Sequence, residues 1–181
     1  MSRTLPRRRL PIGIQSFRKI RERNCYYVDK TSYALRLVQE GTHYFLSRPR
    51  RFGKSLFLDT LKELFAGNQE LFKGLDIHQR WDWSVRNPVV RLDFSCTNAN
   101  DPADLDEDVR EQLDEIECQA GVEPRHSTAR GRFRHLLRSL HRRSGQEVAV
   151  LVDEYDKPIL DVLEEPRIAR SNRTTCAACT R

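Results

Sequence analysis

An unbroken apolar run at residues 148–152 stops abruptly at two acidic residues, Asp153 and Glu154. A strand that is apolar on both faces is typical of a parallel sheet covered by helices on either side. Consecutive parallel strands need long crossover connections, which are usually helical. The run therefore favours an α/β fold, with the two acids at the end of a strand.

The rest of the chain alternates as such a fold requires. A short aromatic run predicts a buried strand at 42–47, and a β-branched run opened by Pro88 predicts a second strand at 88–94. Apolar residues at helical spacing predict helices over 31–40, from Lys54 to Gly67, over 102–120 and around 133–140. We also expect Trp81-Asp82-Trp83 to form a packed corner before the second strand rather than a base-stacking platform.

The net charge of +6 is unevenly distributed along the chain. Residues 1–24 carry +7 and residues 167–181 carry +4, so the body between them carries −5. Basic tails touch nucleic-acid backbones without specificity, but they are more often solvated arms. The charge of the body thus gives no support to nucleic-acid binding, and we expect residues 1–9 to be a disordered basic leader.

No apolar run approaches the roughly 18 residues that span a bilayer, and no apolar segment follows the N-terminal arginines as in a signal peptide. We therefore expect a cytoplasmic protein with no membrane partner. In that compartment the five cysteines are free thiols. Cys176 and Cys179 lack the second ligand pair that a zinc site needs, and the scattered histidines predict no metal site.

Gly53-Lys54-Ser55 lies between the first predicted strand and a strongly apolar helix. Backbone N–H groups and the helix dipole converge on an anion at such a junction. The glycine allows close approach, the lysine reaches the β- and γ-phosphates, and the serine hydroxyl is a ligand for Mg²⁺. Only the second half of the phosphate-loop motif is matched, because its first glycine falls at Arg48; an ordinary helix start is the alternative.

Asp153 and Glu154 supply the complementary chemistry. A carboxylate at the end of a buried strand holds Mg²⁺ through water, and a neighbouring glutamate orients or deprotonates an attacking water. Acids after a strand are also common as turn formers and helix caps. The order favours the functional reading, because the loop comes first and the acids follow about a hundred residues later.

Several longer motifs resemble the predicted AAA-ATPase-like family. They are Leu10-Pro11-Ile12-Gly13-Ile14, Tyr27-Val28-Asp29-Lys30-Thr31, Phe45-Leu46-Ser47-Arg48-Pro49-Arg50-Arg51-Phe52-Gly53-Lys54-Ser55, Phe72-Lys73-Gly74-Leu75 and Val152-Asp153-Glu154-Tyr155-Asp156-Lys157-Pro158. The resemblance runs from about residue 10 to about residue 173. It implies a P-loop NTPase-like three-layer fold with a mostly parallel sheet, and ATP and Mg²⁺ as ligands.

The site residues follow from the motifs and the resemblance together. Nucleotide binding is assigned to Arg48, Arg50, Arg51, Phe52, Gly53, Lys54 and Ser55, catalysis to Lys54 and Glu154, and metal binding to Ser55 and Asp153. Structural ion pairs are the alternative for the three arginines. Asp29-Lys30 resembles the N-terminal motif of the family; it lies either near the nucleotide or at a solvated strand-to-helix corner.

The resemblance implies further sequence after the region matched here, often a restriction-nuclease-like domain. We expect residues 10–165 to be a partial P-loop domain and 166–181 to be the end of the match with an aberrant tail. Residues 174–181 can be encoded so that one added G restores Asp-His-Leu-Arg-Gly-Leu-Tyr-Ala, which suggests a single-nucleotide deletion. Resequencing would test this. The strands after the acid pair would then be missing.

The loop strand, the 88–94 strand and the acid-pair strand would be strands 1, 2 and 3 of the implied sheet, with strand 4 belonging between 1 and 3. Without it, unpaired sheet edges would favour self-association. We therefore expect an ATP-binding, ATPase-type domain that hydrolyses ATP in an intact parent but binds it poorly and does not hydrolyse it here. A binding-only nucleotide or anion sensor and an inert fragment are the alternatives.

Overall fold

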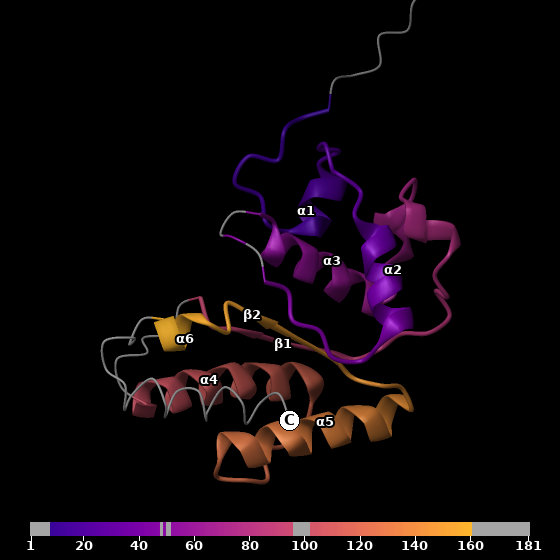
Figure 1. Ribbon diagram of the computed structural model, residues 1–181. Helices are drawn as coiled ribbons and strands as arrows, with labels where there is room; N and C mark the ends of the chain where they lie inside the picture. The colour runs from indigo at the N-terminus through magenta and orange to yellow at the C-terminus, as the bar shows by residue number, and fades with distance from the viewer. Residues whose placement is uncertain (1–7, 48, 50–51, 96–101, 161–181) are drawn as a thin grey trace, which may run out of the picture. The chain divides into compact units, whose positions relative to one another are not determined.

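The computed structural model describes residues 8–47, 49, 52–95 and 102–160 of the chain. The chain divides into two compact units, Met1–Arg86 and Asn87–Arg181 (Figure 1), and each is described by itself. Within the ranges just given, no helix is both long enough and apolar enough to cross a membrane.

The first unit is helical. Its elements are α1 (Phe17–Glu22), α2 (Thr31–Glu40), α3 (Lys54–Phe65) and two short 3₁₀ turns, η1 (Gln69–Phe72) and η2 (Asp76–Gln79). The Phe17 ring lies 4.9 Å from that of Phe72 and 5.0 Å from that of Tyr27, between ring centroids. The helices predicted over 31–40 and from Lys54 are confirmed, although α3 ends at Phe65, two residues before Gly67.

The strand predicted at 42–47 is wrong in this structure. Residues 43–47 adopt no regular secondary structure, and the aromatic side chains expected to be buried are exposed, Tyr44 by 51% and Phe45 by 66%. A strand is stable only when a neighbour takes up its backbone hydrogen bonds. The described part of Met1–Arg86 contains no strand that could serve as this neighbour.

The Trp81–Trp83 corner is packed, as predicted. The Trp83 ring lies 5.2 Å from the Phe72 ring, and its indole N–H donates to the His78 carbonyl at 2.8 Å. Trp81 meets Phe65 edge-on at 5.9 Å. These contacts pack both indoles, which are half-buried, against neighbouring rings of the first unit.

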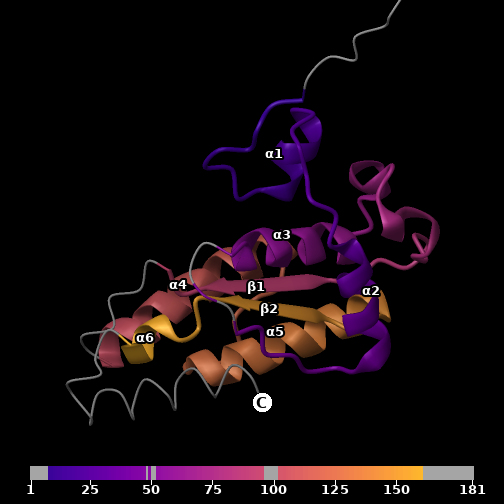
Figure 2. The ribbon, with the colours of Figure 1, turned by 45° about the horizontal axis from the view of Figure 1, so that its top comes forward.

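The second unit contains a parallel pair of strands and the helices of their crossover. Its elements are β1 (Val89–Asp93), α4 (Pro102–Ala120), α5 (Ala129–Ser144), β2 (Ala149–Asp153) and α6 (Lys157–Leu160). The strands run side by side in the same direction (Figure 2), in a register that pairs Val89 with Ala149 and Asp93 with Asp153. The two predicted strands and the two predicted helices of this region are confirmed. The mixed helix and strand content is compatible with an α/β fold.

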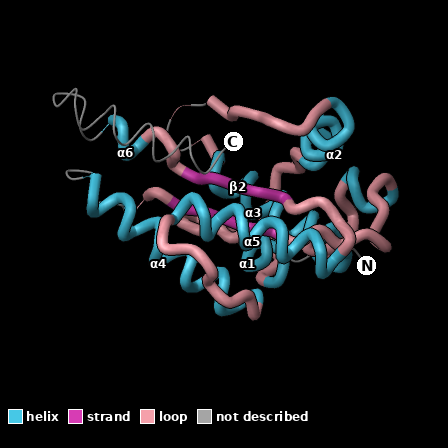
Figure 3. Tube along the Cα trace, turned by 90° about the horizontal axis from the view of Figure 1, so that it is seen from below, coloured by secondary structure: helices cyan, strands magenta, loops and turns pink. Residues whose placement is uncertain are grey.

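One face of the two strands packs against α4 and α5 and forms the core of this unit. Figure 3 views the strands from the side of these two helices. Val90 and Leu92 of β1, and Phe94 directly after it, are at alternate positions and are fully or almost fully buried. Val150 and Val152 of β2 are on the same face by register and pack against the same cluster. The alternation assigns the intervening residues of each strand to the opposite face.

The two helices of the crossover are joined by a buried ion pair. Arg132 of α5 is only 8% exposed and contacts the carboxylate of Glu117 on α4, which is 2% exposed. A second bond, of 2.5 Å, joins Arg132 to the more exposed Asp114. The hydrogen bond to Glu117 raises the pKa of Arg132, so this guanidinium stays charged. The pair fixes the rotation of α5 against α4.

Some expectations fall outside the described residues. Residues 1–7 of the expected leader and all of the expected tail, including Cys176 and Cys179, are among them. Arg9, at the end of the expected leader, forms an isolated parallel bridge with Cys25. Cys25 and Cys118 are free thiols.

Candidate functional site

The candidate phosphate-binding segment begins at Gly53, which precedes the first residue of α3. Its backbone is left-handed, with φ 79° and ψ 27°. A Cβ added there would meet no atom within 4 Å, so the backbone conformation, and not crowding, favours glycine. The positive φ turns the chain sharply into the helix at the residue before Lys54.

The N-terminus of α3 is open electrostatically. Among the described residues no side chain caps the start of α3 and no acid occupies its first turn, whereas the side chains of Ser16 and Thr128 cap α1 and α5. The first intrahelical bond runs from the Phe57 N–H to the Gly53 carbonyl, at 3.0 Å. The preceding N–H groups have no helical acceptor, and the helix dipole adds partial positive charge. A helix start of this kind can bind an anion.

The predicted binding residues are only partly described. Lys54 and Ser55 open α3 and are half-buried, and Phe52 is 59% exposed. The exposed ring indicates that Phe52 would contribute its amide rather than a packed side chain. Arg48, Arg50 and Arg51 lie outside the described residues, so their assignment stays a prediction.

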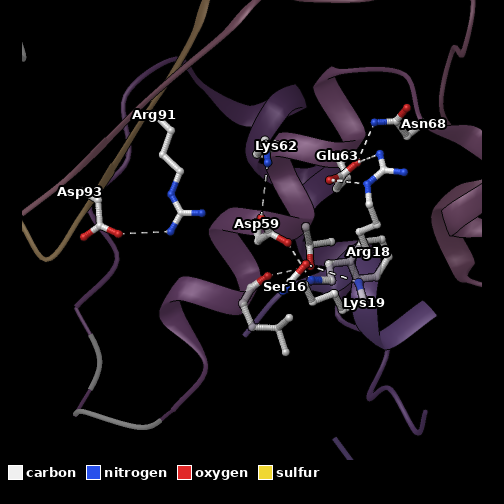
Figure 4. A network of polar contacts seen from close by, with 12 residues as sticks. Ser16, Arg18, Lys19, Asp59, Lys62, Glu63, Asn68, Arg91 and Asp93 are labelled. Carbon is white, nitrogen blue, oxygen red and sulfur yellow. Dashed lines mark hydrogen bonds and ion pairs between the residues drawn. The ribbon is translucent and has the colours of Figure 1, made fainter. Parts of the chain in front are cut away.

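Two buried acids anchor α3 to α1, and sequence reasoning missed both. The Phe17 N–H at the start of α1 donates to Asp59 at 2.7 Å, and Arg18 donates to Glu63 at 2.6 Å (Figure 4). Asp59 and Glu63 are 6% and 4% exposed. Their spacing of one helical turn, inside an otherwise apolar arc, was the signal in the sequence. The contacts hold the helix that carries Lys54.

The candidate metal-binding segment is the end of β2. Asp153 is buried, and one carboxylate oxygen accepts the Glu154 N–H at 3.2 Å. The other oxygen, Oδ2, accepts a hydrogen bond from Arg91 Nη2 on the neighbouring strand at 3.1 Å. Arg91 Nη2 also lies 3.6 Å from Asp93 Oδ2 (Figure 4). The buried carboxylate thus has a cation beside it.

The register of the sheet explains this grouping. Asp93 pairs with Asp153 and Arg91 with Leu151, so Arg91, Asp93 and Asp153 project from one face. It is the face opposite Val90 and Leu92 in the core. Sequence reasoning did not single out Arg91, although a charged residue in the middle of an apolar strand is an unusual choice.

Glu154 has an unusual backbone, with φ 50° in a residue other than glycine. Positive φ in such residues is uncommon and concentrates at functional sites. The Glu154 carbonyl accepts the Lys157 N–H at 3.0 Å and so starts the turn into α6. The turn therefore begins directly after Asp153.

The residues at the end of β2 fit a hard cation such as Mg²⁺. Besides Asp153, the turn contains a buried oxygen, Asp156 Oδ1, for which no hydrogen-bond partner is found among the described residues. Oxygen ligands suit Mg²⁺, which binds through one or two carboxylates together with water and substrate phosphates. The described ranges contain no cluster of three or more His, Cys, Asp or Glu side chains able to form a closed metal cage. Mg²⁺ does not require such a cage.

Asp29 has a structural role. Its Oδ1 accepts the N–H and the hydroxyl of Thr31 at 2.9 and 2.7 Å, and its Oδ2 accepts the Asp76 N–H at 2.7 Å. Burial raises the pKa of Asp29, but the bonds from Asp76 and Thr31 outweigh it and leave the pKa below its usual value. Asp29 therefore joins the starts of α2 and η2, which favours the corner alternative.

The two halves of the candidate site belong to different units. Gly53, Lys54 and Ser55 are in Met1–Arg86, and Asp153 and Glu154 are in Asn87–Arg181. Within the second unit the structure brings Asp153 together with Arg91 and Asp93, which sequence reasoning had left out.

Comparison with known proteins places these features in a family. The model of a family described as Predicted AAA-ATPase matches residues 11–178. A curated protein of Azotobacter chroococcum mcd 1, named "Uncharacterized protein in vnfD 5'region", is 56% identical over 170 residues, which are 93% of this chain and 33% of that protein. The chain thus spans about a third of the length of this relative. No solved structure matches the chain.

Proposed function

The chain belongs to the Predicted AAA-ATPase family, and from that premise we propose that it binds Mg²⁺·ATP at the N-terminus of α3. The observation that carries the proposal is the uncapped start of α3, which follows a left-handed glycine and opens with Lys54 and Ser55. Backbone N–H groups at such a start bind phosphate oxygens. Membership of the family supports a nucleotide as the ligand that carries these phosphate groups.

Each site residue has a distinct role in the proposal. Lys54 pairs with the β- and γ-phosphates, and the Ser55 hydroxyl and the Asp153 carboxylate hold the metal. Held by these two residues, Mg²⁺ would offset the negative charge of the phosphates. Glu154 orients the attacking water and accepts its proton in members that hydrolyse ATP.

Calorimetric titration with Mg²⁺·ATP tests the binding proposal. Lys54→Ala should weaken binding by at least about tenfold, because a hydrogen bond from a charged group contributes roughly 1.5–3 kcal/mol. Lys62→Ala is the matched control, since Lys62 lies two turns further along α3 and its side chain is 46% exposed. Equal affinities in the parent and in Lys54→Ala would refute the proposal.

We propose binding without turnover for this chain and hydrolysis for full-length relatives. The reason is that the sheet is small: residues 43–47 are not a strand, and within the described ranges the sheet contains β1 and β2 alone. Phosphate release from ATP measures this. Robust turnover by the 181-residue chain that depends on Lys54 would contradict it.

Glu154→Gln separates an ATPase from a binding-only sensor. In an ATPase the amide can no longer accept the proton, so hydrolysis by a full-length relative should be lost while affinity stays within about twofold. In a sensor neither quantity depends on this carboxylate.

We further propose self-association through the edges of the β1–β2 pair. In the described part of the sheet each strand has only one neighbour, so one row of backbone donors and acceptors faces outward. Light scattering over a concentration range tests this, and a constant monomer mass would contradict it.

A further inference from the structure

Asp153 poses a charge problem when no metal is bound. Its side chain is only 4% exposed. A buried carboxylate is strongly destabilising unless a partner compensates its charge. In this structure the compensating group is Arg91, whose Nη2 lies 3.1 Å from Asp153 Oδ2.

We propose that Arg91 is a placeholder cation: it neutralises Asp153 in the metal-free protein and turns to Asp93 when Mg²⁺·nucleotide arrives. The inference rests on the proposed function, because it gives Asp153 the role of a metal-binding carboxylate. It makes Arg91 a positioning residue that sets how much Mg²⁺ the protein needs.

Asp93 is placed to receive the guanidinium. Arg91 Nη2 is already 3.6 Å from Asp93 Oδ2, so a small rotation of the side chain exchanges one carboxylate for the other. Asp93 itself is held firmly, since the Gln112 amide bonds both its N–H and its carbonyl, at 2.8 and 3.0 Å. Its Oδ1 accepts the Ser95 N–H at 2.9 Å, which leaves Oδ2 directed to Arg91.

Like charges supply the reason for the exchange. A guanidinium and Mg²⁺ on the same carboxylate repel each other, and the repulsion is only weakly screened at a buried group. The side chain of Asp93 is 41% exposed and that of Asp153 is 4% exposed. The metal would therefore compensate the buried carboxylate of Asp153, and Arg91 would pair with the more exposed carboxylate of Asp93.

The first experiment measures ATP affinity across a series of Mg²⁺ concentrations by calorimetry. Arg91→Met should lower the Mg²⁺ concentration at half-maximal effect by about tenfold, since the competing cation is gone, and Arg91→Lys should lie between it and the parent. Arg110→Met, which removes an exposed arginine paired with Asp106 on α4, should leave the value unchanged.

The second experiment uses no nucleotide. Thermal unfolding of Arg91→Met should begin at a lower temperature than that of the parent, and millimolar Mg²⁺ should restore more of the loss than the same ionic strength of NaCl. Arg91→Met combined with Asp153→Asn should also recover stability, because the buried negative charge that Arg91 compensates is then removed.

The outcomes distinguish the two proposals. Equal or higher Mg²⁺ requirements in Arg91→Met and Arg91→Lys than in the parent would overturn the placeholder role and leave nucleotide binding standing. A parent that binds no ATP at any Mg²⁺ concentration would refute the proposed function. If Arg91→Met does not fold, Arg91→Lys keeps the Mg²⁺ test decisive. Lysine retains the positive charge but lacks the planar guanidinium group that contacts the carboxylate.

Discussion

Asp29 shows how a single carboxylate can hold two elements of the first unit together. It accepts three hydrogen bonds from Thr31 and Asp76 and joins two elements that are far apart in the sequence. The aspartate at this motif position is therefore explained by hydrogen bonds within the protein.

We expect Asp29→Ala to lower the free energy of unfolding by about 1 kcal/mol at pH 7, a modest value because the residue is exposed and water competes for its bonds. The folded pKa is depressed, so this stability is present above the unfolded pKa of about 3.9 and is lost as the pH falls through the folded value. Urea unfolding at pH 7 and pH 3 measures it. A difference between parent and variant that grows toward acid would contradict the assignment.

Glu154 makes a prediction about the backbone. Positive φ in a residue other than glycine costs roughly 1 kcal/mol or more, while glycine loses about 0.5–1 kcal/mol through chain entropy. Glu154→Gly should thus match or slightly exceed the parent in stability, whereas Glu154→Val should lose about 1–2 kcal/mol. Urea midpoints would show this, and equal stability of the two variants would mean that the positive φ is absent in solution.

At the scale of elements, the buried ion pair between α4 and α5 has the largest expected effect. Arg132→Ala leaves Glu117 buried and uncompensated, which should cost about 3–5 kcal/mol of unfolding free energy. Combining Arg132→Met with Glu117→Leu should recover most of it, since an apolar pair of similar size fills the space. Arg110→Ala, at an exposed pair, should change stability by less than about 1 kcal/mol. A similar loss for Arg132→Ala and Arg110→Ala in chemical unfolding would contradict this view.

Elements fixed by local pattern were predictable from sequence. Helices over 31–40 and 102–120 follow from apolar residues at helical spacing, and the strands from β-branched runs. The 42–47 segment has the composition of a strand, but strand formation also depends on a distant neighbour. The Arg91–Asp153 pair was unpredictable for a related reason, because it depends on the register of β1 with β2. Lys54 and Asp153 were identified from their motifs and from the family resemblance, and their joint action is still a proposal.

For the molecule as a whole, ligand binding should appear as thermal stabilisation. Mg²⁺·ATP at about 100 times its Kd adds roughly 2.7 kcal/mol to the folded state. In a chain of this length that amounts to a rise in Tm of roughly 5–10 °C. Scanning calorimetry of the parent and of Lys54→Ala tests it, with the variant expected to show no rise at the same ligand concentration. An equal rise in both would indicate a different binding site.

The contacts of α3 with α1 have a practical consequence for mutant screens. Asp59 lies six residues beyond Gly53, or about 9 Å along a helix, so the contacts with α1 hold the same helix that begins with Lys54. Substituting Arg18, which donates to Glu63 on this helix, should make the position of Lys54 less well defined without removing a group proposed to bind the nucleotide. A mutant screen restricted to the loop before α3 would miss substitutions in α1 that weaken nucleotide binding through α3.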